Sequence, residues 1–418
     1  MMSNTGCLAT GETRFTPHTL GEVIELKRGY DLPSKDRIKG QYPIISSSGI
    51  SGSHSDYQVE GPGVVTGRYG TLGQIFYEKE NFWPLNTTLY VKDFKGNHPK
   101  FIYYFLKTLD FLAFSDKAAV PGLNRNDLHT ANILFPNDIY YQKSVASILG
   151  SLDDKIDLNR RTNETLEAMA QALFRDWFVD FGPTRAKMAG EAPYLVPELW
   201  ELFPDRLDDE GKPEGWHISS IGDETDIVGG STPSTSNPIF WNGNHYWATP
   251  KDLSGLNSPV LSDTSRKITD EGLTQISSGL LPSGSVLLSS RAPVGYTAIT
   301  TVPLAINQGF IGVKCTQSLS APYVLLWMKE SMELILQNAN GSTFQEISKK
   351  NFRPLPIIKA SHDLLKAFDT QSQGIFDKII ANDAESHTLT QLRDLLLPKL
   401  MSGEISIRDA EKMVEDAA

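Results

Sequence analysis

The chain has 418 residues, about twice the length of one compact domain, so two or three domains are expected. Its 40% hydrophobic and 21% charged residues exclude a wholly disordered protein, and its two cysteines, Cys7 and Cys315, are too few for a disulfide framework or a thiolate metal site. The net charge of −11, taken over the whole chain, argues against a protein that binds nucleic acid.

The N-terminal residues read MMSNTGCLATGETRF and contain neither a basic start nor an apolar block, so we expect no signal peptide. No apolar run in the sequence is long enough to cross a membrane. Together with the low cysteine content, these features predict a protein of the reducing cytoplasm.

A first module is expected over residues 1–138, and much of it recurs as a second module over residues 216–360. The repeat shows as short echoes that keep their order, each in a β-rich stretch. One echo runs from Gly63 to Arg68 and again from Gly284 to Arg291, which would put Arg68 and Arg291 at equivalent points. The other echoes are Leu20-Gly21-Glu22 with Ile221-Gly222-Asp223, Pro84-Leu85-Asn86 with Leu304 to Asn307, Val91-Lys92 with Val313-Lys314, Gly122 with Gly341, Leu128 with Ile347, and Phe135-Pro136 with Leu355-Pro356.

A long helix is expected after each module, over residues 139–182 and 361–400. Residues of both helices repeat at alternating spacings of three and four, which is the a/d pattern of a coiled coil. The helix-pairing residues are Leu152, Ile156, Asn159, Leu166 and Leu173 in the first helix and Ile375, Ile379, Asn382, Leu389 and Leu396 in the second. A shift of 223 residues places Asn159 on Asn382, and a buried asparagine in each seam fits a role in fixing the register.

Two long helices with matching seams most simply pair with each other, and a whole module between them favours an antiparallel pair. From Val145 to Trp177 the first helix would extend roughly 50 Å, with the modules at opposite ends. Gly182-Pro183 and Pro398 are predicted to end the two helices. Two independent amphipathic surface helices are the alternative.

Residues 183–215 contain five prolines and the acidic run Asp208-Asp209-Glu210, which predicts a connector laid over a surface. Its aromatic residues Tyr194, Trp200 and Phe203 indicate that it packs against another part of the protein. Residues 401–418 are expected to form a tail with a short helix.

The sequence nominates no catalytic residues and no metal ligands. The eight histidines are scattered, and no zinc motif, serine-nucleophile elbow, Walker A loop or dinucleotide fingerprint is present. The glycine-rich stretch from Gly67 to Gly73 has the wrong spacing for a phosphate loop, so we interpret it as a tight turn or as a close approach of the backbone to a ligand. Glu25-Leu26-Lys27 lacks the Pro-Asp partner of a nuclease motif.

The acidic residues are concentrated outside the two modules. Residues 14–138 carry 14 basic and 13 acidic side chains, and residues 216–360 carry 10 of each. The connector has a net charge of −4 and residues 361–418 a net charge of −5. Near-neutral modules with local basic groups are compatible with DNA binding, because such groups neutralise phosphates while polar loops read base edges.

Candidate DNA contacts follow from these basic groups and from polar loops at matching places in the modules. Arg68 and Arg291 would contact guanine or phosphate, or pair internally with an acid. For the basic pairs and the loops, a solvated surface and ordinary turns are the alternatives. The candidates are Lys27, Arg28, Ser46, Ser47, Ser48 and Arg68 in the first module and Thr249, Lys251, Arg266, Lys267, Arg291, Lys349 and Lys350 in the second.

From about Thr19 to Ile405 the chain resembles the specificity subunits of type I restriction-modification systems. The most specific match is Leu158 to Phe181, LNRRTNETLEAMAQALFRDWFVDF, which is similar to the central helix of the family. Other matching stretches are Pro213 to Trp216, Leu288 to Gly295, Asn307 to Phe310 and Leu392 to Glu404.

The resemblance implies an α+β protein in which two repeated target-recognition domains are joined by two long antiparallel helices that form a coiled coil. Each domain would read one half of a split site in double-stranded DNA, and the helices would set the spacer. It implies no cofactor in this chain. Two methyltransferase subunits would dock and bind S-adenosylmethionine, and endonuclease subunits would bring ATP and Mg. The competing hypotheses are a coiled-coil scaffold that binds only protein and a standalone DNA-modifying enzyme.

Overall fold

The computed structural model describes residues 15–115, 122–341 and 345–416, so Cys7 and the rest of the N-terminal segment lie outside the described residues. The chain divides into two compact units. Unit 1 comprises residues 1–156 and 387–418, and unit 2 comprises residues 157–386. Within the described ranges, no helix is long and apolar enough to cross a membrane.

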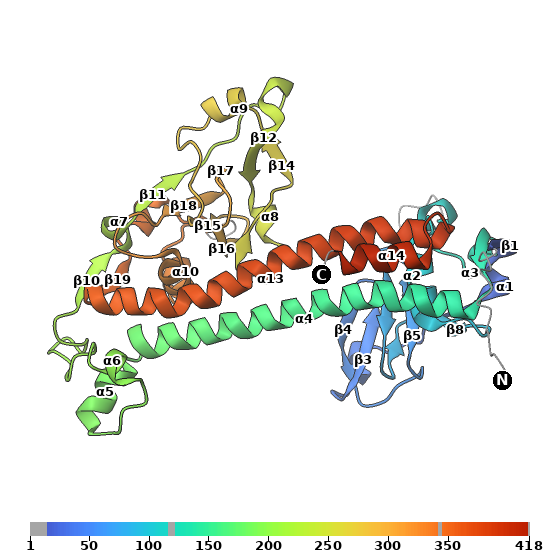
Figure 1. Cartoon of the computed structure of the whole chain (residues 1–418), viewed down its shortest axis with the longest axis horizontal. Helices are drawn as coiled ribbons and strands as arrows, with labels where there is room; N and C mark the ends of the chain where they lie inside the picture. Colours follow the sequence, from blue (N-terminus) through green and yellow to red (C-terminus); the bar gives the residue numbers. More distant parts are fainter. Residues whose placement is uncertain (1–14, 116–121, 342–344, 417–418) are drawn as a thin grey trace, which may run out of the picture. The chain divides into compact units, whose positions relative to one another are not determined.

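Two long helices, α4 (Ile139–Phe178) and α13 (His362–Ser402), each contribute one part to unit 1 and the other part to unit 2. The other elements of unit 1 are β1 (Phe15–Thr19), α1 (Leu20–Val23), β2 (Glu25–Arg28), η1 (Ser34–Asp36), β3 (Tyr42–Ser46), β4 (Gly49–His54), β5 (Gly63–Gly67), β6 (Ile75–Glu78), β7 (Trp83–Pro84), β8 (Thr88–Asp93), α2 (Pro99–Lys107), η2 (Phe111–Phe114), α3 (Arg125–His129), β9 (Asn132–Pro136) and α14 (Ile407–Glu415). They form a four-stranded sheet, β2-β8-β5-β6, a three-stranded sheet, β4-β3-β7, and the antiparallel pair β1-β9 (Figure 1).

The other elements of unit 2 are α5 (Gly182–Ala189), α6 (Pro197–Trp200), β10 (His217–Ser220), α7 (Ile221–Glu224), β11 (Asp226–Gly229), η3 (Pro238–Phe240), β12 (Trp241–Ala248), α8 (Pro250–Leu253), β13 (Val260–Leu261), β14 (Arg266–Ile268), α9 (Asp270–Thr274), β15 (Val286–Ser290), β16 (Val294–Thr300), β17 (Leu304–Ile306), β18 (Phe310–Lys314), α10 (Ala321–Glu330), α11 (Met332–Gln337), α12 (Lys349–Phe352) and β19 (Pro356–Lys359). Its sheets are β11-β18-β15-β16-β13 and β14-β12-β17, with the separate pair β10-β19.

The strand pairing confirms the predicted duplication. In unit 1, β5 lies between β8 and β6, and in unit 2, β15 lies between β18 and β16. The short parallel pair β3-β7 corresponds to the parallel pair β12-β17. The chain also enters both modules in the same way, since Leu20 N donates to Ala131 O at 2.9 Å and Ile221 N donates to Leu355 O at 3.0 Å.

The hydrogen bonds correct the alignment at the central strand of each module. The backbone N–H groups of Arg68 and Ser290 make corresponding bonds to the neighbouring chain, each at 2.8 Å, so these two residues are equivalent. Tyr69 is therefore equivalent to Arg291, and the predicted equivalence of Arg68 and Arg291 is wrong by one residue. A shift of one residue matters because successive side chains of a strand point to opposite faces.

The last echo of the repeat is also corrected. Leu128 and Phe352 each donate a backbone hydrogen bond to the residue just before their short helix, Asn124 and Ser348 respectively, so they are equivalent. Ala131 is equivalent to Leu355, whereas the echo in the sequence matches Phe135, four residues further along, to Leu355. Similar dipeptides recur by chance in strands, and the hydrogen-bond pattern of the backbone decides between them.

In unit 1 the first part of α4 packs against the last part of α13 in antiparallel orientation. Tyr141 Oη donates to Leu400 O at 2.7 Å, and Arg393 Nη1 donates to Asp153 Oδ1 at 2.8 Å. Asp153 Oδ2 also accepts a 2.5 Å hydrogen bond from Tyr104 of α2. Burial raises the pKa of Tyr141 to about 12, so its hydroxyl stays protonated and remains a donor.

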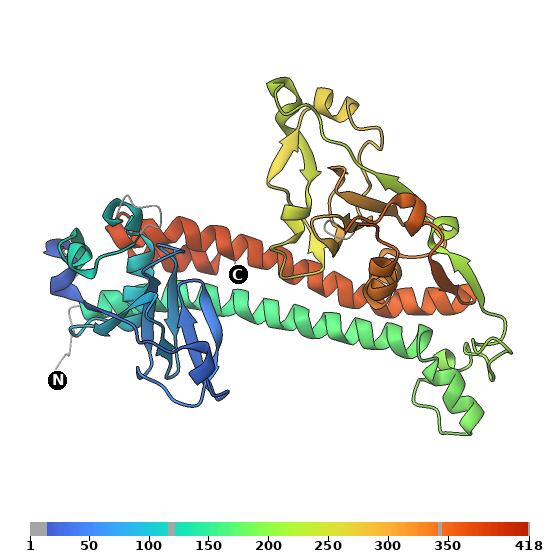
Figure 2. The same ribbon diagram turned by 180° about the vertical axis from the view of Figure 1, so that it is seen from behind.

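In unit 2 the remaining parts of α4 and α13 also run antiparallel, and both views show them side by side (Figures 1 and 2). Phe368 of α13 is fully buried, and its ring centroid lies 5.1 Å from that of Phe178 and 5.9 Å from that of Trp177, both on α4. Tyr323 of α10 lies 5.8 Å from the same ring. This aromatic cluster therefore joins both long helices to the core of the second module.

Three buried asparagines also lie between the helices of unit 2. Asn382 Nδ2 donates to Asn163 Oδ1 at 2.8 Å, and Asn159 Nδ2 donates to Glu385 Oε2 at 2.7 Å. Asn163 Nδ2 in turn donates to Ile379 O at 3.3 Å. Amides buried in this way favour the one register in which they find partners, because an unsatisfied buried amide costs about 1–3 kcal/mol.

The helix-pairing residues predicted from the heptads divide into two groups by burial. Buried are Leu152, Asn159, Ile379, Asn382, Leu389 and Leu396, and half-buried are Ile156, Leu166, Leu173 and Ile375. Leu152, Ile156, Leu389 and Leu396 belong to the core of unit 1. Leu166, Leu173, Ile375 and Ile379 belong to the core of unit 2.

The predicted ends of the helices need correction. Pro398 does not end α13, which continues to Ser402 with the proline inside it. Leu400 and Met401 beyond it are buried in unit 1, and this burial offsets the hydrogen bond that a proline removes. The first helix ends at Phe178, and Gly182-Pro183 begins the new helix α5.

The connector packs against the core of unit 2 through Phe203, while Trp200 lies against Tyr194 and Lys187 of the connector itself. Trp200 and Phe203 are buried, and the Phe203 ring lies 5.1 Å from that of Trp177. Tyr194 is 52% exposed, and its hydroxyl donates to Asp176 of α4 at 3.0 Å, so it also contacts a part of the protein outside the connector. The segment also contains α5 and α6, so it is more ordered than a simple linker.

Candidate nucleic-acid interface

In unit 1 two of the predicted polar segments lie against each other. Ser46 ends β3, and Ser47 and Ser48 form the turn to β4, where Ser46 Oγ donates to Gly49 O at 2.8 Å. A Cβ built on Gly67 would lie 3.2 Å from Ser47 Cβ, so this serine turn touches the turn that carries Arg68. Gly70, with φ of +81°, closes the second turn, as the glycine pattern predicted.

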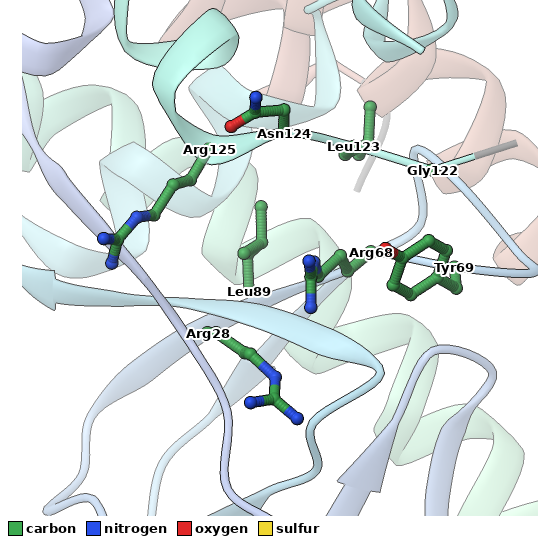
Figure 3. A pocket seen from close by; sticks show the side chains of 8 residues that line it. All are labelled: Arg28, Arg68, Tyr69, Leu89, Gly122, Leu123, Asn124 and Arg125. Carbon is green, nitrogen blue, oxygen red and sulfur yellow. The ribbon is translucent and has the colours of Figure 1, made fainter. Parts of the chain in front are cut away.

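Three arginines line one pocket beside these turns. Arg28 from β2, Arg68 from the turn after β5 and Arg125 from the start of α3 line one pocket of about 500 Å³. Figure 3 shows the three side chains around it, with that of Arg125 directed away from that of Arg68. Tyr69, Leu89 and Asn124 also line the pocket. We call this space the arginine pocket. The sequence predicts Arg28 and Arg68 as contacts, but it does not indicate Arg125 or Tyr69.

Lys27 and Arg28 were predicted as one basic pair, but they diverge. Adjacent residues of a strand point to opposite faces. Arg28 lines the arginine pocket and also pairs at 3.1 Å with Asp31, which does not line it. The Lys27 ammonium instead lies 5.3 Å from the centre of the Tyr30 ring. A hydrogen bond with Tyr90 lowers the pKa of Tyr30.

In unit 2 the second predicted basic pair lies on the small sheet. The guanidinium of Arg266 stacks 3.5 Å above the ring of Trp241 and 5.5 Å from that of Trp247. The Lys267 ammonium lies 4.4 Å from the Tyr246 ring and 4.0 Å from Asp263. The stacking holds the Arg266 guanidinium in a defined orientation. Because Arg266 is also exposed, it remains accessible to a ligand.

The polar segment that was expected to be a loop is instead the short helix α8 with Thr249 as its N-cap, and it is tied to the start of β14. Thr249 Oγ1 donates to Asp252 Oδ2 at 2.8 Å, and Asp252 Oδ1 accepts from Ser265 N at 2.8 Å. Burial would raise the pKa of Asp252, but the hydrogen bonds from Ser265 and Thr249 outweigh it and hold the pKa below its usual value. The carboxylate therefore joins the chain segments that carry exposed Lys251 and Arg266 into one surface.

A second group in unit 2 occupies the place that the arginine pocket has in unit 1. Half-buried Arg291 forms a backbone bridge with Glu346. The Lys349 side chain lies over Gly229, since a Cβ built on this glycine would be 3.1 Å from Lys349 Nζ. Lys350 is exposed on the same short helix. Arg353, which follows these lysines closely in the sequence, donates inward to Ile227 O at 2.9 Å and is structural.

Among the described residues, no group of three or more His, Cys, Asp or Glu side chains is arranged to hold a metal ion. Cys315 is half-buried, and its burial raises the pKa of the thiol to about 12. It is therefore a protonated core residue at neutral pH.

Comparison with known proteins shows the family. Residues 13–168 and 213–359 match the type I restriction modification DNA specificity domain, once for each module. The specificity subunit of the type I restriction enzyme HindI from Haemophilus influenzae is 28% identical over 73% of this chain and 77% of its own length. The MjaIX specificity subunit of Methanocaldococcus jannaschii is 31% identical over 47% of this chain and 46% of its own length.

The fold is also similar to that of a solved structure. The crystal structure of a type I restriction-modification S subunit from M. genitalium covers 94% of this chain and 97% of its own length, with a TM-score of 0.59 and 16% identity. A match of this extent takes in both modules and both long helices. The chain therefore belongs to the type I restriction-modification DNA specificity family, as a specificity subunit and not a catalytic one.

Proposed function

We propose that this chain binds double-stranded DNA and that each of its two modules reads one half of a bipartite site. The observation that carries the proposal is the duplicated module, whose polar loops stand at the same places but present different side chains. Unit 1 presents serines and three arginines there, and unit 2 presents a stacked Arg266 and two lysines. Two similar folds with different surfaces suit two different half-sites.

In this proposal α4 and α13 set the spacer between the half-sites and dock two methyltransferase subunits. Each long helix is part of both units, and regularly wound helices of 40 and 41 residues give a defined length. The methyltransferase subunits bind S-adenosylmethionine, and endonuclease subunits with ATP and Mg complete the assembly. This chain needs no cofactor of its own and works in the cytoplasm.

The test is DNA binding by the chain assembled with its methyltransferase subunit, at several salt concentrations. We expect the logarithm of the binding constant to fall linearly with the logarithm of salt concentration, by about 0.9 for each phosphate neutralised, with tighter binding to one bipartite sequence than to random duplex. A scaffold that binds only protein would show no salt-dependent DNA binding in this assay, and that result would refute the proposal.

A further inference from the structure

We infer that the arginine pocket of unit 1 binds one phosphate of the DNA backbone and that unit 2 has no counterpart of equal strength. The inference rests on the proposed DNA binding and assigns one contact within it. Arg28, Arg68 and Arg125 come from three separate elements, and no acidic side chain is among the described residues that line the pocket. Three positive side chains around one pocket make its electrostatic potential positive, so an anion bound there is stabilised.

The backbone around Arg68 is held on both sides. Its N–H donates to Thr87 O at 2.8 Å, and its carbonyl accepts from Leu123 N at 2.9 Å. The Tyr69 ring packs on the Arg68 guanidinium at 4.7 Å. A Cβ on Gly122 would lie 2.6 Å from the Tyr69 ring, so a glycine is needed for this ring position. The Arg68 guanidinium is thus oriented before any ligand arrives.

The other two arginines are also oriented by their neighbours. Arg28 is paired with Asp31 at 3.1 and 3.3 Å, which leaves the remaining donors of its guanidinium for a ligand. Arg125 begins α3, where the Asn124 side chain caps the helix by accepting from Asn126 N at 3.0 Å. The charge of the three arginines together with Asp31 is +2, which is sufficient to neutralise a phosphodiester.

The equivalent positions in unit 2 show that the fold does not need these arginines. Arg28 corresponds to Gly229, Arg68 to Ser290 and Arg125 to Lys349, as the strand and helix hydrogen bonds establish. Glu346 stands where unit 1 has Gly122. The second module keeps the same strand pairing without these three arginines. The arginines of unit 1 are therefore not needed for the fold, and we assign them to a ligand.

A phosphate suits the pocket better than a base edge. The three arginines line the pocket from three elements, so their donors can reach the oxygens of a tetrahedral anion from more than one side. A guanine edge offers only two acceptors in one plane, which a single arginine satisfies. The contact therefore positions the DNA and carries no sequence information itself.

The test compares the wild-type complex of full chain and methyltransferase with the variant R28Q/R125Q and with the control K79Q. Lys79 lies in unit 1 outside the pocket, beside Asp154. We expect R28Q/R125Q to bind cognate and random duplexes more weakly by the same factor, with the salt slope reduced by about 1. K79Q should behave as the wild type, and equal thermal midpoints would show that the variants are folded.

Duplexes carrying one neutral methylphosphonate at a time identify the source of the phosphate. At one backbone position the substitution should weaken the wild-type complex and have no further effect on R28Q/R125Q. The inference would be overturned if each methylphosphonate weakened the wild type and R28Q/R125Q equally. It would also be overturned if R28Q/R125Q lost base preference in one half-site. A third result would also overturn the inference: inorganic phosphate binds to the wild type but not to R28Q/R125Q, while both proteins give the same methylphosphonate profile. The pocket would then bind a free anion. Failure of the wild-type complex to bind DNA at all would instead refute the proposed function.

Discussion

Replacement of Phe368 by alanine is expected to destabilise unit 2 by about 3–5 kcal/mol, because a fully buried phenylalanine leaves a cavity among rigid neighbours. The lost ring contacts Phe178 and Trp177 of α4 and Tyr323 of α10. The substitution therefore weakens the attachment of both long helices to the module at once.

Tryptophan fluorescence is a suitable measurement of this effect. Six of the seven tryptophans lie in unit 2, and only Trp83 lies in unit 1. The midpoint of urea unfolding followed by fluorescence should fall clearly in F368A. The control M169A truncates a side chain of α4 that is 54% exposed and should shift the midpoint by less than about 0.5 kcal/mol equivalent. Equal midpoints for F368A and wild type would contradict the assigned role of the cluster.

Replacement of Arg266 by alanine is expected to relax the base preference at one position of one half-site by about 1–3 kcal/mol. The stacking on Trp241 at 3.5 Å fixes the plane of the guanidinium, which is the geometry that bidentate recognition of guanine requires. Lysine keeps the charge but lacks the planar fork. R266K should therefore lose the preference as R266A does, while it keeps the salt slope of the wild type.

The measurement is competition between duplexes that differ at single positions, with the chain bound to its methyltransferase subunit. The neighbouring variant K267A serves as the comparison, because Lys267 points to the other face of β14 and stacks on Tyr246. We expect K267A to weaken all duplexes alike. A uniform loss of affinity in R266A, with the salt slope reduced by about 1, would mean that Arg266 contacts phosphate and would contradict base reading.

Features of long sequence range could be predicted because they repeat. The paired helices could be predicted from the sequence alone. Heptads extend over both helices, and an offset of 223 residues aligns Asn159 with Asn382. The order of the echoes predicts two similar modules. Hydrophobic periodicity and internal repetition are strong signals because many residues contribute to each.

Features that depend on single residues were predicted less well. The sequence aligns Arg68 with Arg291, whereas the hydrogen bonds align it with Ser290. This difference of one residue is not visible in the sequence, because the two stretches can be aligned in more than one way. Pro398 continues the helix because burial of Leu400 and Met401 compensates for the lost hydrogen bond, and burial is not visible in the local sequence.

The candidate contacts show the same limit. Arg125 is distant in sequence from Arg28 and Arg68, and only the packing of α3 against β2 brings it into their pocket. Trp241 lies 25 residues before Arg266, and pairing of β12 with β14 creates their stack. Composition could nominate basic residues, but it could not distinguish the inward Arg353 from the exposed Lys349 and Lys350.

Base-resolved mapping of methylation tests the central claim most directly. DNA would be modified by the complex of this chain with its methyltransferase subunit and sequenced for methylated adenine. We predict one recognition sequence made of two defined runs of bases separated by a fixed number of undefined bases, because two modules read it and the helices α4 and α13 set the spacing. A single uninterrupted run, or methylation without sequence preference, would contradict the account.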